Sequence, residues 1–268
     1  MGEQLTGVFA ESRATGRAAL LPYLTAGLPD PESSTALFVA MAEAGADGFE
    51  VGIPYSDPLM DGPVIQEAGA RALAAGANLE RSLQIVASVA TETSKPVIAM
   101  TYTNPVLAMG REQFCARVAE AGGSGLIIAD LPAEEASPFL EAAHTAGLSM
   151  ALFVAPTTDE ARLLRIVGLD PGFLYGVADL GVTGERAAAS TRAAELAARV
   201  RRATDLPLVL GVGISTPDQA RLAGGLADGV IVGTALVRRV LEATDARVAA
   251  SSLAGAVADL AAALGARH

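Results

Sequence analysis

Short runs of apolar residues recur along this chain and are separated by longer stretches in which apolar positions return every three or four residues. Runs of four to seven mostly apolar residues are typical of strands buried on both faces, as in parallel sheets. Eight runs are predicted as strands: 19–25, 48–52, 97–102, 125–130, 150–154, 173–177, 206–211 and 229–233. The spacing between them predicts helices over 33–44, 79–91, 111–121, 134–146, 159–167, 187–203 and 217–223.

The junctions between these elements repeat as well. Segments 43–48, 120–125 and 225–229 each end a helix on glycine and enter a strand, which indicates one βα unit used several times. The turn after the first strand lacks the glycine-rich pattern of an open doubly wound sheet. Eight units therefore favour a (β/α)8 TIM barrel. We expect a single barrel domain over 1–268, with an N-terminal helix over 1–16 at the barrel bottom, an extra helix after strand two and a last helix over 245–264.

Composition narrows the classes of partner. Hydrophobic residues make up 51% of the 268 positions, which is enough for one large core. Nineteen Lys and Arg against thirty Asp and Glu give a formal net charge of -11, which argues against nucleic acid and anionic membranes as partners. The pattern predicts no signal peptide and no membrane span. Since Cys115 is the only cysteine, no intrachain disulfide is expected, and a cytoplasmic location is predicted.

One acidic residue interrupts a strand that otherwise reads as buried. Glu50 lies between Phe49 and Val51, and the neighbouring strands offer no basic residue to pair with it. A carboxyl group in the apolar mouth of a barrel has a raised pKa, which suits it to donate and accept a proton near neutral pH. The alternative is that Glu50 caps a loop or joins an ion pair. In the loop that follows, Asp57 is interpreted as a turn residue, while Asp61 fits either a turn or a reactive site.

Small residues gather in the loops after the last three predicted strands, at 180–185, 211–215 and 232–236. Backbone N–H groups in such loops can approach an anion, and a helix beginning near Thr234 adds its positive N-terminus. The loops after strands seven and eight are the usual phosphate position of a TIM barrel. His144 and His268 are the only histidines and Lys95 is the only lysine, so the sequence predicts no metal site, no cofactor and no Schiff base.

Segment 50–63, EVGIPYSDPLMDGP, resembles the signature of the tryptophan synthase alpha subunit family, and segments 22–27, 101–105, 129–132, 181–184 and 211–215 match in family order. The resemblance implies a cofactor-free lyase of tryptophan biosynthesis. It would cleave indole-3-glycerol phosphate by a retro-aldol reaction into indole and glyceraldehyde 3-phosphate. The family passes indole to a beta subunit within a complex of two alpha and two beta subunits.

Carried over by position, the resemblance makes Glu50 the acid–base residue that protonates indole C3 and takes the proton of the glycerol hydroxyl. It makes Asp61 the acceptor of the indole N–H. It also implies substrate contacts at Tyr23, Met100, Tyr102, Tyr175, Thr183 and Val212, and phosphate contacts at Gly184, Gly213, Gly233 and Thr234.

Three other functions remain open at this point. The first is a lyase that works alone and releases indole for specialised metabolism. The second is a barrel without activity that regulates a beta subunit by docking, although a carboxyl such as Glu50 in the barrel mouth has no use in docking. The third is a sugar phosphate isomerase or epimerase on the same fold. Indole release by the isolated chain, with and without a beta subunit, separates the first from the family reaction.

Overall fold

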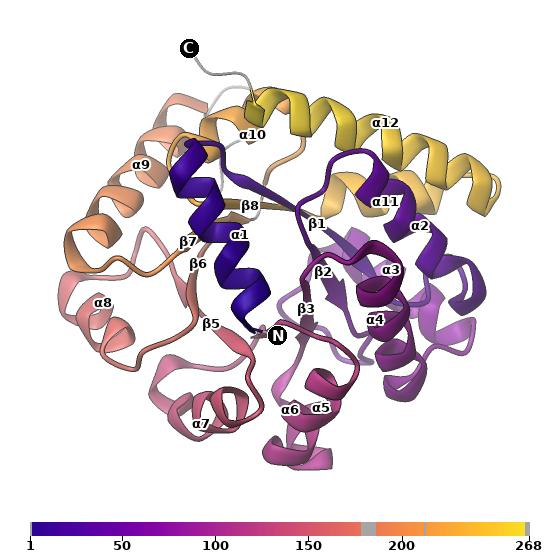
Figure 1. Cartoon of the computed structure of the whole chain (residues 1–268), viewed down its shortest axis with the longest axis horizontal. Helices are drawn as coiled ribbons and strands as arrows, with labels where there is room; N and C mark the ends of the chain where they lie inside the picture. The colour runs from indigo at the N-terminus through magenta and orange to yellow at the C-terminus, as the bar shows by residue number, and fades with distance from the viewer. Residues whose placement is uncertain (1, 178–185, 212, 266–268) are drawn as a thin grey trace.

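A computed structural model describes residues 2–177, 186–211 and 213–265 (Figure 1). Eight parallel strands form a closed barrel in sequence order, and β8 pairs with β1. The strands are β1 Ala19–Thr25, β2 Phe49–Gly52, β3 Val97–Thr101, β4 Gly125–Ile128, β5 Ser149–Val154, β6 Phe173–Val177, β7 Leu208–Gly211 and β8 Gly229–Val232. The predicted TIM barrel is confirmed, and every predicted strand forms within two residues of its expected ends.

Helices surround the barrel. They are α1 Gly2–Thr15, α2 Pro31–Glu43, α3 Pro63–Ala74, α4 Leu79–Thr93, α5 Thr103–Met109, α6 Arg111–Glu120, α7 Ser137–Thr145, α8 Glu160–Val167, α9 Arg186–Ala203, α10 Pro217–Gly224, α11 Thr234–Glu242 and α12 Ala246–Gly265. The expected helix over 134–146 is wrong in its first turn: a short 3-10 helix over Ala133–Glu135 precedes α7. Pro138 explains the break, because proline fits the first turn of a helix but removes a hydrogen bond further inside.

The N-terminal helix closes one end of the barrel, as predicted. In Figure 1, α1 crosses the barrel near its centre. Leu5 and Phe9 are buried, and the Phe9 ring lies 5.7 Å from the ring of Phe173, the first residue of β6. The Ser12 hydroxyl donates to the backbone carbonyl of Asp228 at 2.6 Å, just before β8. Since these contacts fall at the N-terminal ends of the strands, α1 leaves the C-terminal ends free for a site.

Asp228 links several elements at this closed end of the barrel. Its buried carboxylate accepts from the guanidinium groups of Arg13 and Arg201, at 2.8 and 2.9 Å, and from the backbone N–H of Leu208 at 2.7 Å. Burial by itself would raise the pKa of Asp228, but these donors outweigh it and hold the pKa below its usual value. The carboxylate therefore ties α1, α9 and β7 together.

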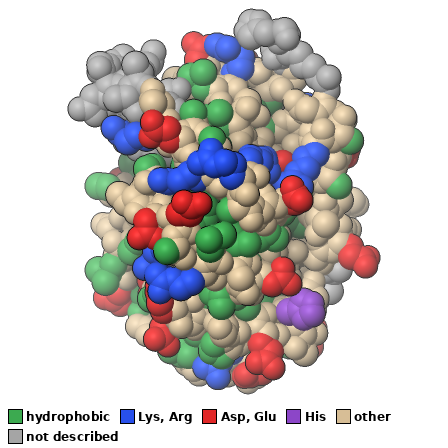
Figure 2. Space-filling model, turned by 90° about the vertical axis from the view of Figure 1, so that its left-hand side faces the viewer, with side chains coloured by type: hydrophobic (Ala, Val, Ile, Leu, Met, Phe, Trp, Pro, Cys, Tyr) green, Lys and Arg blue, Asp and Glu red, His purple; other side chains and the backbone are tan. Residues whose placement is uncertain are grey.

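The outer helices bury one side and expose the other. By length and composition alone α12 could span a membrane, but it packs against α2 and α10 and buries Leu253, Val257 and Leu260. The face over α7 to α9 mixes basic and acidic side chains (Figure 2), and Arg162 bridges to Glu134 there at 2.9 Å. Because acidic and basic side chains are mixed on this face, it does not form a uniformly basic surface for an anionic ligand.

Alternation along β2 directs Glu50 into the barrel. The Phe49 ring packs on Phe38 of α2 in an edge-on contact, with ring centroids 5.4 Å apart, so Phe49 points outward to the helical layer. Successive side chains of a strand point to opposite faces, so Glu50 points inward. Its register partner on β1 is Tyr23. The strand therefore delivers one carboxyl group to the barrel interior.

Candidate active site

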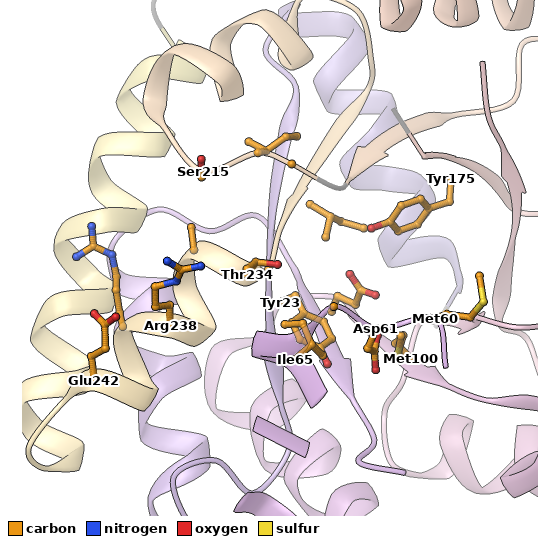
Figure 3. Close-up of a pocket in the computed structure, with 18 residues that line it drawn as sticks. Tyr23, Met60, Asp61, Ile65, Met100, Tyr175, Ser215, Thr234, Arg238 and Glu242 are labelled. Atoms are coloured by element: carbon orange, nitrogen blue, oxygen red, sulfur yellow. The ribbon is translucent and has the colours of Figure 1, made fainter. Parts of the chain in front are cut away.

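A cavity of about 800 Å³ opens at the C-terminal ends of the strands. This volume suits a ligand with an aromatic ring and a phosphorylated side chain. Eight of the residues expected from the sequence line it: Tyr23, Glu50, Asp61, Met100, Tyr175, Gly213, Gly233 and Thr234. Figure 3 shows Asp61 and Met100 on one side of the cavity, and Thr234 and Arg238 of α11 on the other.

Glu50 is a buried acid that forms no ion pair with any residue that the structure describes. Its residue is only 3% exposed, and within the described part of the chain its Oε2 atom has no hydrogen-bond partner. Burial raises the pKa of Glu50 to about 8, and the nearby Asp61 carboxylate contributes to the rise. An ion pair with Lys or Arg would lower this pKa instead. The carboxyl is therefore mostly protonated at pH 7 and can exchange a proton near neutral pH.

Asp61 has a more polar environment on the loop between β2 and α3. Burial raises its pKa, and a hydrogen bond with the Tyr102 phenol opposes the rise. The Tyr102 oxygen accepts the backbone N–H of Met60 at 3.2 Å, which leaves the phenolic proton for Asp61. The Tyr55 ring packs beside Tyr102 with centroids 5.3 Å apart, and Asn104 donates to the Tyr55 oxygen at 3.1 Å. Tyr102 thus lies beside Asp61 and does not line the cavity among the described residues.

Two buried phenols form the inner wall. Burial raises the pKa values of Tyr23 and Tyr175 well above the usual range, so both remain neutral. A Cβ atom on Gly52 would overlap the Tyr23 hydroxyl, and one on Gly211 would overlap the Tyr175 hydroxyl. Because Gly52 on β2 and Gly211 on β7 have no side chain, they leave the space that the two phenol rings occupy. Further apolar surface comes from Ile65, Met100, Ile214 and Ile231.

The opposite side of the cavity offers backbone donors. Gly213 has a φ of +74°, a conformation that favours glycine. The first residue of α11 is Thr234, and Gly233 before it provides no side-chain cap. The first helical hydrogen bonds run from Leu236 and Val237 to the Gly233 carbonyl. The N–H groups of Thr234 and Ala235 are thus available to a ligand, and the helix terminus favours an anion.

Some expected residues lie elsewhere. Thr183, Gly184 and Val212 fall outside the described residues. Asp57 is exposed and accepts from the Ser56 hydroxyl at 2.6 Å, in keeping with its interpretation as a turn residue. Over the described ranges, no group of three or more His, Cys, Asp or Glu side chains is arranged to hold a metal ion.

Sequence reasoning missed several lining residues, including Ile65, Ile231, Arg238, Arg239 and Glu242. The α3 residue Ile65 belongs to a helix that the spacing did not single out. A signal for Arg238 did exist: it follows Thr234 by four positions, and such residues share one face of a helix.

Comparison with known proteins gives a consistent result. The family model described as tryptophan synthase alpha chain matches residues 9–264. The tryptophan synthase alpha chain of Salinispora tropica is 47% identical over 254 residues, which is 95% of either chain. That of Synechococcus sp. (strain CC9902) is 46% identical over 245 residues, or 91% of each. A solved structure of Mycobacterium tuberculosis tryptophan synthase superposes with a TM-score of 0.89 at 39% identity, covering 98% of this chain and 99% of that one. The chain therefore belongs to the tryptophan synthase alpha chain family.

Proposed function

We propose that this chain is a lyase that cleaves indole-3-glycerol phosphate into indole and D-glyceraldehyde 3-phosphate in tryptophan biosynthesis. One observation carries the proposal: Glu50, a buried acid that forms no ion pair within the described residues, shares a cavity with Asp61 and with an open helix N-terminus. The first two groups fit the proton transfers of a retro-aldol reaction, and the third fits the substrate phosphate.

The first step is a proton transfer to the ring. Glu50 is largely protonated at neutral pH, so it can donate to indole C3. The resulting indolenine carries positive charge at its nitrogen, and the Asp61 carboxylate accepts the N–H hydrogen bond and stabilises that charge. Tyr102 helps because its hydrogen bond opposes the rise in the pKa of Asp61. The two carboxyl groups thus differ in their surroundings: a phenol donates to Asp61, whereas Oε2 of Glu50 has no partner among the described residues.

The second step breaks the carbon–carbon bond. The Glu50 carboxylate, now ionised, takes the proton of the glycerol hydroxyl next to the ring. That carbon becomes the aldehyde of glyceraldehyde 3-phosphate, and the bonding electrons return to the indolenine and restore indole. Glu50 ends protonated as it began, so no proton is gained or lost. The ring serves as the electron sink, a role that a metal ion or a lysine Schiff base fills in other aldol cleavages.

The phosphate would anchor the substrate opposite the acids. The open N–H groups of Thr234 and Ala235 and the backbone at Gly213 and Gly233 face the cavity. They offer neutral donors and a helix dipole, which bind an anion in a strongly acidic chain. The two buried phenols and Met100 would enclose the indole ring.

The test is product analysis. The purified chain is incubated with indole-3-glycerol phosphate, and indole and glyceraldehyde 3-phosphate are measured separately. We expect both products in equal amounts. Asp61→Asn should reduce cleavage at least a hundredfold, whereas the matched control Asp57→Asn should stay within twofold of the wild type. Turnover of simple sugar phosphates without indole release would contradict the proposal and support an isomerase.

We also propose a beta subunit as partner. The apolar side chains of Leu59, Met60 and Leu107 are 88%, 64% and 51% exposed on the β2–α3 loop and on α5, beside the mouth. Exposed apolar groups of this size suit a protein interface. Addition of a tryptophan synthase beta subunit should increase the cleavage rate. An unchanged rate together with high activity of the isolated chain would support the lyase that works alone.

We also propose a single-domain organisation and a cytoplasmic location. Residues 1–268 would act as one domain, since α1 and α12 both pack on the barrel. The protein would work in the cytoplasm, where its small phosphorylated substrate is available.

A further inference from the structure

The rim of the cavity holds an arginine that the reaction described above does not use. Arg238 lies on α11, one turn after Thr234, and lines the cavity. Helical side chains tilt toward the N-terminus of their helix, so that of Arg238 extends back over the turn of Thr234. Figure 3 shows its guanidinium group reaching toward Thr234, on the side of the cavity with the open N–H groups.

This guanidinium group has no partner within the described residues: no hydrogen bond or ion pair joins Arg238 to another side chain or to the backbone. Many other arginines of the described chain do have hydrogen-bond or ion-pair partners. Arg239 donates to the Ser252 hydroxyl of α12 at 3.1 Å. Eight further arginines form ion pairs: Arg13, Arg17, Arg71, Arg111, Arg117, Arg162, Arg201 and Arg221. The side chains of other exposed arginines, such as Arg81 and Arg202, also lack a partner among the described residues. What distinguishes Arg238 is its place at the cavity, where a chain of net charge -11 offers an unpaired cation to a ligand.

We propose that Arg238 is a specificity-determining residue, which forms a charge-assisted hydrogen bond to the substrate phosphate and selects phosphorylated over unphosphorylated indole compounds. The inference deepens the proposed function and rests on it. The N-terminus of α11 would hold the phosphate through backbone N–H groups. These groups carry only partial positive charge, so they offset the charge of a dianion incompletely. A guanidinium group adds a full positive charge and two donors in a planar fork that matches phosphate oxygens.

Glu242 is the one acidic lining residue near Arg238, and it lies a further turn along α11. No ion pair joins the two side chains in the described structure. Glu242 is exposed, and Figure 3 places it beyond Arg238 on the side away from Thr234. Glu242 therefore does not hold the guanidinium group of Arg238 in the described structure.

The experiment compares Arg238→Gln with the control Arg202→Gln, an exposed arginine in the last turn of α9 that does not line the cavity. Both arginines are exposed, so both variants should fold. Arg238→Gln should raise the KM for indole-3-glycerol phosphate about fivefold to tenfold with kcat within twofold, and Arg238→Lys should recover part of the loss. The inhibition constant of glycerol 3-phosphate should rise equally, whereas that of indole-3-propanol, which has no phosphate, should not move. Arg202→Gln should change each value less than twofold.

Equal effects of the two Gln variants, or equal weakening of the phosphate-free inhibitor, would overturn the role of Arg238. This outcome is distinct from a failure of the proposed function. If the wild type does not cleave the substrate, calorimetric binding of glycerol 3-phosphate to wild type and Arg238→Gln still tests the arginine: weaker binding by Arg238→Gln supports it, and unchanged binding refutes it.

Discussion

Replacing Glu50 with glutamine should make the stability of the protein less sensitive to a rise in pH from 4.5 to about 8. Burial raises the pKa of Glu50 from 4.5 to about 8, so the folded protein retains a proton that the unfolded chain releases. A raised carboxyl pKa gives stability that is fully present below pH 4.5 and is lost as pH rises to 8. Glutamine has a similar shape and does not ionise, so Glu50→Gln removes this dependence.

The size of the effect follows from the pKa difference. Between pH 4.5 and 8 the wild type should lose about 1.4 kcal/mol of unfolding free energy per pH unit relative to Glu50→Gln. From pH 5 to pH 7 the relative change is about 2.7 kcal/mol. The amide of glutamine adds a constant offset that does not vary with pH, so only the slope is diagnostic.

Equilibrium urea unfolding at pH 5, 6, 7 and 8 measures this slope. Glu112→Gln is the matched control, because the Glu112 side chain is 77% exposed, and its stability curve should run parallel to that of the wild type. If the stability difference between wild type and Glu50→Gln stays constant within about 0.5 kcal/mol over this range, Glu50 is not the buried acid described above.

Three further substitutions test the surroundings of the site. Tyr102→Phe removes the phenol beside Asp61, so cleavage should fall about tenfold and the acidic limb of the pH profile of kcat/KM should move to higher pH; an unchanged limb would contradict this role. Gly52→Ala should overlap the hydroxyl and two ring carbons of Tyr23 and cost about 1–3 kcal/mol in thermal unfolding, and this cost should be smaller in a Tyr23→Ala background; an equal cost in both backgrounds would argue against the overlap. Asp228→Asn should lower stability by about 2–4 kcal/mol at pH 7, and this loss should shrink progressively as pH falls below 3.8, since the contribution of a carboxylate with a lowered pKa is lost as pH falls through its folded pKa; a loss that does not change with pH would refute the ionic link.

The strands were predictable because a barrel buries both of their faces, which leaves continuous apolar runs such as 150–154. Glu50 could be singled out for the same reason, because it lies in the middle of such a run, whereas Asp130 ends the run over 125–130. The prediction of the helices was less complete. The short α5 contains Pro105, and α3 follows directly on a proline-rich loop, so neither was distinguished from its loop. Proline in the first turn is compatible with a helix but also with a turn.

Contacts between elements that are far apart in the chain could not be predicted from the sequence. The hydrogen bond between Tyr102 and Asp61 depends on how the β2–α3 loop folds against β3, and no local pattern specifies that approach. The direction of the Arg238 side chain likewise required knowledge of where α11 begins. The magnitude of the pKa shift of Glu50 needed its burial and the position of Asp61.

The central claim is that Glu50 transfers the protons of the cleavage reaction, and the single-turnover rate of indole release by wild type and Glu50→Gln tests it most directly. We predict that the substitution reduces this rate about a thousandfold while glycerol 3-phosphate still binds with unchanged affinity. Indole release by Glu50→Gln within tenfold of the wild-type rate would contradict the account.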